Sequence, residues 1–95
     1  MSKEYKYEEK EVTRTKPFIT INGEELLAWT VHGFITDLEG TDGFKTVRWC
    51  HEYDKVAEPM IEEGLVHRDN RGSWYAGDEE KLAELKNFLE EKFYE

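Results

Sequence analysis

Residues 60–76, with the sequence MIEEGLVHRDNRGSWYA, give the most specific indication of the fold. The stretch opens on the apolar end of a helix, and Gly64 follows where a residue in the left-handed conformation commonly ends one. Two short apolar segments, 65–68 and 73–76, then flank the polar residues 69–72. A polar turn with glycine between two such segments predicts a β-hairpin. The stretch therefore predicts a helix that leads directly into a hairpin.

Residues 78–95, which follow the hairpin, predict an amphipathic helix. Carboxylates at residues 78–80 open it, and negative charge there interacts favourably with the positive end of the helix dipole. Leucine and phenylalanine then recur at a spacing that places them on one face. These apolar residues are Leu82, Leu85, Phe88, Leu89 and Phe93.

Residues 24–38 are predicted to form the first helix of the domain. Apolar side chains recur there at the 3.6-residue spacing of a helix that buries one face, and Trp29 is expected to widen that face and lie in the core. Gly33 and the β-branched Thr30 and Val31 lower helix propensity, so a strand is the alternative over these residues. The main apolar positions are Leu27, Val31, Phe34, Ile35 and Leu38.

Two more helices are expected between this helix and the hairpin. Residues 44–53 fit a short helix with its apolar residues on one side. Residues 55–63 fit another, for which Asp54 offers an N-cap. Pro59 interrupts the second pattern, because proline lacks the N–H that a helix interior requires. That helix is therefore expected to start just before Pro59 or to kink there.

The N-terminal part of the chain divides into a charged arm and a strand. Residues 1–12 are mostly charged and are expected to be frayed unless the arm docks on a partner. Residues 13–21 are rich in β-branched residues, and Pro17 among them favours a strand at a sheet edge. Asn22-Gly23 predicts a turn, and its asparagine can also cap the following helix. A single domain is expected over residues 13–95.

Composition limits the class of protein. A chain of 95 residues forms one domain with one modest core, and 14% aromatic residues argue against disorder. No segment approaches the ~20 apolar residues of a membrane span, and the first residues lack the apolar segment of a secretory signal. The single cysteine, Cys50, cannot form an internal disulfide. We therefore expect a soluble cytoplasmic protein that does not interact with membranes.

Charge is unevenly distributed along the chain. The net charge of −9 argues against a general binder of polyanions. Of the 13 Lys and Arg residues, ten lie in residues 1–16 and 44–77, whereas residues 17–43 contain none. This distribution is consistent with a locally positive face on an acidic protein, or with an ordinary solvated surface.

The order strand, helix, short helix, helix, hairpin, helix resembles that of winged helix-turn-helix domains. The resemblance covers residues 24–95, and its most specific part is the helix end Met60–Val66 followed by a polar hairpin that ends in Trp74-Tyr75. It implies a small α+β domain with a three-helix core, a β-hairpin wing, an N-terminal edge strand and a C-terminal amphipathic helix. Many members bind DNA with the third helix in the major groove and the wing on the backbone, and others bind proteins.

Carried over to this chain, the third-helix positions that would face DNA are Lys55, Glu58 and Glu62. Two of them are acidic, whereas a helix facing phosphates favours Lys, Arg, Ser, Thr or Asn. These acidic residues disfavour DNA reading by this helix, whereas the wing suits phosphate contact and Lys45 and Arg48 of the second helix could add to it. The candidate nucleic-acid-binding residues are Lys45, Arg48, Lys55, Arg68 and Arg71.

No arrangement of residues predicts catalysis or a cofactor. Cys50 and His51 are adjacent and would point apart on a helix, which disfavours a nucleophile and base pair. His32 and His67 do not add the ligand spacing that a zinc site requires. We expect no metal, no cofactor and no enzymatic activity, and we expect Cys50 to be a small buried residue.

An exposed aromatic ring beside arginine is the composition of an interface anchor. Trp49 is expected to be partly exposed, and Trp74 and Tyr75 are neighbours on a strand, so that one points inward and the other outward. The functional centre is expected on the wing, where Arg68 and Arg71 accompany the outward ring. The candidate partner-binding residues are Trp49, Arg68, Asn70, Arg71, Trp74 and Tyr75.

Replacing Arg68 and Arg71 together by alanine is expected to leave thermal stability nearly unchanged, because exposed substitutions usually change it by less than about 0.5 kcal/mol. The same change is expected to weaken partner binding by about 1–3 kcal/mol.

Two functions fit the sequence. The first is a small acidic, non-catalytic regulator or inhibitor that binds another protein, of the kind often encoded by phages and mobile elements, as a monomer or homodimer. The second is a winged-helix transcriptional regulator that binds DNA through the wing and N-terminal arm. If the candidate cations form one face, DNA binding is favoured. If Glu58, Glu62 and Glu63 interrupt that face, protein binding is favoured.

Overall fold

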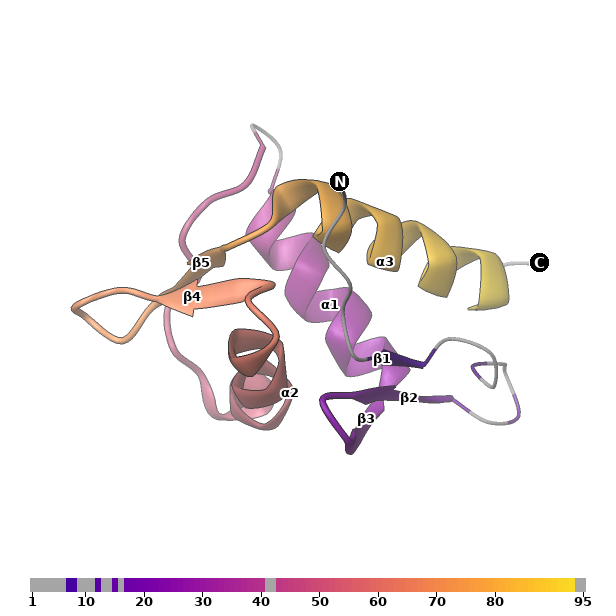
Figure 1. Cartoon of the computed structure of the whole chain (residues 1–95). Helices are drawn as coiled ribbons and strands as arrows, with labels where there is room; N and C mark the ends of the chain where they lie inside the picture. The colour runs from indigo at the N-terminus through magenta and orange to yellow at the C-terminus, as the bar shows by residue number, and fades with distance from the viewer. Residues whose placement is uncertain (1–6, 9–11, 13–14, 16, 41–42, 94–95) are drawn as a thin grey trace.

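The computed structural model describes residues 7–8, 12, 15, 17–40 and 43–93. They form three helices and two antiparallel sheets, which confirms the α+β class (Figure 1). In chain order the elements are β1 (Tyr7–Glu8), β2 (Phe18–Ile21), β3 (Glu24–Leu27), α1 (Ala28–Glu39), α2 (His51–Glu62), β4 (Val66–Arg68), β5 (Trp74–Ala76) and α3 (Glu79–Phe93).

Part of the predicted N-terminal arm belongs to the domain. In the arm, residues 1–12, strand β1 pairs antiparallel with β2, and Val12 has no exposed surface. The other positions of the arm lie outside the described residues.

The first sheet has the strand order β1-β2-β3, so the prediction of an edge strand over residues 13–21 is wrong. Within that range β2 spans Phe18–Ile21 and lies between the other two strands. Pro17 is not in the ladder. It precedes β2, and its carbonyl oxygen accepts the N–H of Ala28 at 2.8 Å. A proline in that place leaves the central strand with all of its N–H donors.

The prediction of a helix over residues 24–38 is wrong for its first four residues, which form β3. Asn22 and Gly23 have φ values of 51° and 79°. Two positive φ angles are typical of the tight turn that joins hairpin strands, and Asn-Gly is its preferred sequence. The turn commits the next residues to pairing with β2, and α1 begins only at Ala28. The local turn geometry therefore overrides the helical periodicity.

The prediction of two helices over residues 44–53 and 55–63 is also wrong, because a single helix, α2, replaces them. Residues 44–50 are not helical. In their middle, Val47 exchanges two backbone hydrogen bonds of 2.8 Å with Trp74 and so adds a bridge beside β5. Pairing with a distant strand outweighs the weak helix propensity of this segment.

Helix α2 continues through Pro59, which is buried near its C-terminal end. The Pro59 carbonyl oxygen accepts the N–H of Glu63, and the predicted stop at Gly64 is confirmed by its φ of 81°. The N–H of Leu65 then bonds to the carbonyl oxygen of Met60, which turns the chain into β4.

The predicted hairpin and C-terminal helix are both present. Strands β4 and β5 pair antiparallel, with Val66 opposite Ala76 and Arg68 opposite Trp74, and the turn between them projects from the body of the molecule (Figure 1). Asp78 accepts the N–H of Lys81 with its side chain and caps α3. Leu82, Leu85 and Leu89 are fully buried, as the apolar stripe predicts.

The core is built around α1, which packs against α3, α2 and the two sheets. Phe34 of α1 meets the buried ring of Trp74 edge-on, at 5.2 Å between ring centroids. Both side chains have no exposed surface. The base of the β4–β5 hairpin is therefore part of the core, whereas its turn is not. Within the described part of the chain, no helix is both long enough and apolar enough to span a bilayer.

Candidate functional site

The β4–β5 hairpin has two distinct faces. Arg68 is opposite Trp74 in the strand register, and His67 is opposite Tyr75. Because side chains alternate along a strand, Arg68 and Trp74 share the inner face and His67 and Tyr75 share the outer one. The His67 and Tyr75 rings lie 5.6 Å apart. Arg68 therefore does not accompany the outward aromatic ring, and this part of the predicted binding centre is wrong.

Trp74 is the inward member of the aromatic pair and Tyr75 the outward one. Trp74 has no exposed surface, whereas Tyr75 is 40% exposed. The prediction that the two rings point to opposite faces is confirmed. Since a buried ring cannot meet a partner, Trp74 is removed from the candidate binding residues. Its indole N–H is buried and has no hydrogen-bond partner among the described residues.

Arg68 contacts α2 and covers Trp74. Its Nη2 lies 3.8 Å from Oδ1 of Asp54 and 3.6 Å from Oε1 of Glu58. The guanidinium carbon lies 5.8 Å from the centre of the Trp74 ring, in cation–π geometry. The charge of Arg68 is thus compensated within the protein, and its side chain joins the hairpin to α2.

Trp49 contacts the carboxylate of Asp54, as Arg68 does. Its indole Nε1 donates to Oδ1 of Asp54 at 2.9 Å, the same oxygen that Arg68 approaches. Asp54 was predicted to cap a helix, but it lies in the first turn of α2 and orients these two side chains instead. Trp49 is 50% exposed, which confirms the prediction of partial exposure. We call Trp49, Asp54, Glu58 and Arg68 the Trp49–Arg68 surface.

The outer side of α2 continues this surface as an acidic one. Lys55, Glu58 and Glu62 are all exposed, at the positions that the winged-helix resemblance would turn toward DNA. Glu62 accepts a hydrogen bond from the Asn22 side chain, so Asn22 does not cap a helix. Carboxylates therefore separate the one lysine of this helix from Arg68.

The hairpin turn is ordered by Asp69. Its Oδ1 accepts the backbone N–H groups of Arg71 and Ser73 at 2.8 and 2.9 Å. Asn70 and Arg71 are exposed on this turn. In the described part of the chain, Arg71 has no ion pair, in contrast to Arg68.

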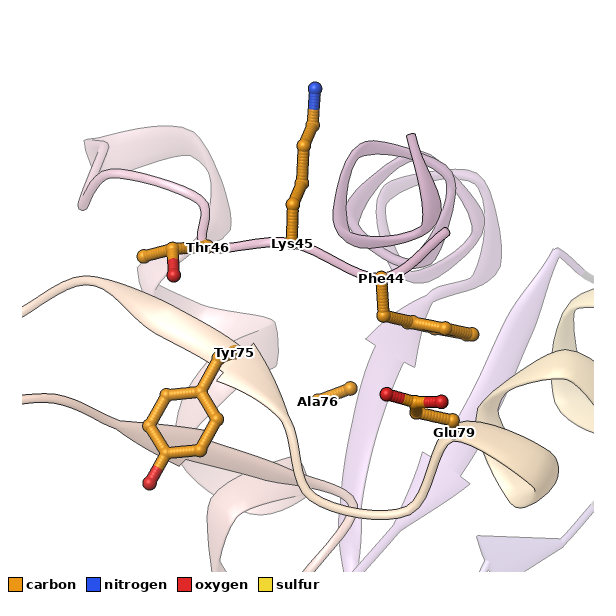
Figure 2. Close-up of a pocket in the computed structure, with 6 residues that line it drawn as sticks. All are labelled: Phe44, Lys45, Thr46, Tyr75, Ala76 and Glu79. Carbon is orange, nitrogen blue, oxygen red and sulfur yellow. The ribbon is translucent and has the colours of Figure 1, made fainter. Parts of the chain in front are cut away.

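The remaining candidate cations lie in the segment before α2. Lys45 and Arg48 are exposed. Lys45 and Thr46 line two shallow pockets of about 220 and 310 Å³. Figure 2 shows the smaller one, where Phe44 and Glu79 lie beside Ala76 and Lys45 extends away from the other lining residues. In Figure 2 the carboxylate of Glu79 points toward Ala76, whereas the Lys45 ammonium points away from it.

The residues considered for chemistry are dispersed. Cys50 is half-buried against the core, and His51 is exposed. His32 Nε2 lies 3.1 Å from Oε1 of Glu90 and links α1 to α3. Among the described residues, no three His, Cys, Asp or Glu side chains lie together as metal ligands.

A partly buried tyrosine, Tyr53, joins α1 to α2. Tyr53 donates its hydroxyl to Oδ2 of Asp37 at 2.5 Å and packs on Phe34. Burial, followed by the hydrogen bond to Asp37, raises the pKa of the Tyr53 phenol well above its usual value. The phenol is thus kept neutral and acts as a structural donor.

An exposed apolar group on β2, β3 and α1 was missed by the sequence reasoning. Phe18, Leu27 and Trp29 are 45, 43 and 42% exposed, so the expectation that Trp29 lies in the core is wrong. Leu27 was assigned to the buried face of a helix that begins only at Ala28, and Trp29, which is in that helix, lies on its exposed side. The Asn-Gly turn was the signal that could have placed Leu27 on a strand.

Comparisons with protein-family models, curated proteins and solved structures give no match to this chain.

Proposed function

We propose that the chain is a non-catalytic regulator that binds another protein through the Trp49–Arg68 surface. The partner would present a basic surface. The winged-helix relationship belongs to the same proposal, as the scaffold on which the hairpin and α2 form this surface.

The observation that carries the proposal is the setting of Trp49. Its ring is half exposed, yet the hydrogen bond to Asp54 restricts its orientation. An ordered aromatic ring loses little conformational entropy on binding, which is why tryptophan is enriched among binding hot spots. On the same surface Asp54 and Glu58 place two carboxylates beside Arg68. The two carboxylates outnumber Arg68 within the Trp49–Arg68 surface, and this excess of negative charge favours a partner that carries lysine or arginine.

DNA binding through the wing and N-terminal arm is less well supported by the same geometry. Arg68 is compensated by Asp54 and Glu58, and acidic side chains lie on the helix that would enter a groove. Four candidate cations remain exposed, but so few charges on an acidic protein give only weak, salt-sensitive attraction to phosphate. They are Lys45, Arg48, Lys55 and Arg71.

The test is affinity capture from nuclease-treated lysate of the source cells, with wild type and variants immobilised at equal density. Trp49→Ala should reduce capture of the specific protein by about 10- to 100-fold, the loss typical of a hot-spot residue. Glu58→Lys should reduce it as well. Tyr75→Ala, on the outer face of the hairpin, is the matched aromatic control and should retain the partner. The partner is then purified and titrated against the same variants by calorimetry.

Capture that survives Trp49→Ala and Glu58→Lys but is lost with Tyr75→Ala would place binding on the other face and refute the proposal. Retention that requires intact nucleic acid would favour the DNA-binding function instead.

A further inference from the structure

A second exposed apolar surface lies on the β2–β3 hairpin. Figure 1 shows this hairpin and the β4–β5 hairpin on different sides of the molecule. Phe18 and Leu27 are directly opposite each other in the strand register, and Trp29 follows two residues later in the first turn of α1. We call these three residues the Phe18–Leu27–Trp29 patch.

The inner face of the β2–β3 hairpin packs into the hydrophobic core. Ile19 and Leu26, the next pair in the register, are 1 and 7% exposed. The pair beyond them, Thr20 and Glu25, faces outward with polar groups, as expected of a solvated sheet face. Phe18 and Leu27 are on that same outward face and are apolar. Two large apolar residues at one exposed pair of a solvated face, with an exposed tryptophan two residues further along the chain, indicate an interaction surface.

Among the described residues, the charged side chains beside the patch are the carboxylates of Glu25 and Glu90. Glu25 lies on the same outward face as Leu27, two residues away. On the α1 side, the Trp29 ring packs edge-on against His32 at 5.7 Å, and His32 holds Glu90 of α3 at 3.1 Å. A molecule that binds the patch would therefore be favoured if it carried cations beside its apolar side chains.

Charge and size both argue against a second copy of the chain as the occupant. An isologous contact would bring two acidic rims together on molecules of net charge −9. The three partly exposed side chains offer on the order of 300 Å², whereas a stable dimer buries about 800 Å² on each partner. A short peptide segment needs less area.

We propose that the Phe18–Leu27–Trp29 patch docks a short basic amphipathic segment of a partner protein, with alternating apolar and cationic side chains. The apolar residues of the segment would cover Phe18, Leu27 and Trp29, and its cations would meet Glu25 and Glu90. This docking is independent of the Trp49–Arg68 surface.

The test uses the full chain, labelled with ¹⁵N, and a synthetic octapeptide of alternating leucine and lysine. Amide shift changes on titration should be largest over residues 18–29. Replacing Phe18 and Leu27 by threonine, the residue of the neighbouring pair at position 20, should weaken binding by about tenfold. Trp29→Gln is a second variant that does not alter the strands. Tyr75→Thr makes a comparable change on the other hairpin and should bind like wild type, as should Trp49→Ala.

Two control peptides separate the contributions of charge and apolar surface. Alternating leucine and glutamate should not bind, because the rim is acidic, and alternating serine and lysine should not bind, because the patch requires apolar cover. Equal binding of the leucine–glutamate peptide would overturn the proposal, as would shift changes centred on α2. Concentration-dependent dimerisation that is abolished by the threonine variant, or binding to anionic vesicles, would assign the patch to a second copy or to a membrane instead.

Discussion

The guanidinium of Arg68 lies between two carboxylates of α2 and above the buried ring of Trp74. Arg68→Ala should lower the free energy of unfolding by about 1 kcal/mol, because it removes partly exposed ion pairs and a cation–π contact. Arg71→Ala should change it by less than about 0.5 kcal/mol, since that side chain is exposed on the turn. Urea unfolding of the two single variants measures the difference.

Equal stability of the two variants would contradict the contacts assigned to Arg68. The double substitution is accordingly expected to be destabilising, in contrast to the expectation from sequence alone. Arg68→Lys is the control for charge, because it keeps the cation but loses the planar group over Trp74.

Tyr53 is expected to make the protein less stable as the pH rises into the alkaline range. Its pKa is raised by burial and by the hydrogen bond to Asp37, so the folded protein holds the phenolic proton at pH values where the unfolded chain loses it. The unfolded state then binds fewer protons, and the free energy of unfolding falls as pH rises above about 10, the usual tyrosine value. Tyr53→Phe should show a shallower decline over the same range, measured by denaturant unfolding at several pH values.

Tyr75→Phe is the matched control, since it removes an exposed phenol that donates to no carboxylate in the described structure. If the free energy of unfolding falls equally steeply with pH in wild type and in Tyr53→Phe, another group is responsible for the loss of stability at alkaline pH.

At residue scale, sequence reasoning selected Trp49 and Arg68 but not their common partner. An exposed tryptophan and an arginine at a hairpin are recognisable from composition. That both meet one oxygen of Asp54 depends on where α2 begins, and the sequence placed that helix boundary wrongly. The face of the hairpin that Arg68 occupies follows from strand register, which is fixed only by the pairing with Trp74.

At the scale of elements, Gly77 marks the close approach between the end of β5 and the end of α2. A Cβ at this residue would lie 2.5 Å from the carbonyl oxygen of Gly64 and 2.9 Å from Nε2 of His67. Gly77→Ala should therefore destabilise the protein by about 1–3 kcal/mol through overpacking. Thermal unfolding monitored by circular dichroism measures the change.

Gly33→Ala is the matched substitution within a helix. Its Cβ would meet the Tyr53 hydroxyl at an ordinary 3.5 Å, and alanine in a helix interior is favoured over glycine by roughly 0.5–1 kcal/mol. The two variants should shift the melting temperature in opposite directions, and a gain in stability from Gly77→Ala would disprove the close approach.

The elements that the sequence predicts correctly are those with strong local signals. Hairpin β4–β5 and helix α3 follow from a glycine-containing turn and from a leucine stripe, and both are present. The segments 24–27 and 44–50 were predicted as helix and are extended. Their conformation is imposed by pairing with other strands, and such pairing is non-local information that periodicity does not contain.

At the scale of the whole molecule, the net charge of −9 opposes approach to DNA. We expect duplex binding to be weak and to vanish by about 150 mM salt. The salt slope should be no more than about 4, because Arg68 is already paired and four candidate phosphate-binding cations remain, Lys45, Arg48, Lys55 and Arg71. Fluorescence anisotropy of a labelled duplex, measured over a range of salt concentrations, tests this. Submicromolar, sequence-selective binding at about 150 mM salt would favour the DNA-binding function.

The reciprocal hydrogen bonds between Val47 and Trp74 tie together two points of the chain that are separated by the whole of α2. Opening of the hairpin base therefore breaks both bonds at once, so the segment before α2 and strand β5 form a single cooperative unit. The amide hydrogens of Val47 and Trp74 should exchange with solvent at one common opening free energy. The amides of the hairpin turn, beyond this bridge, should exchange sooner through fluctuations that leave the core closed.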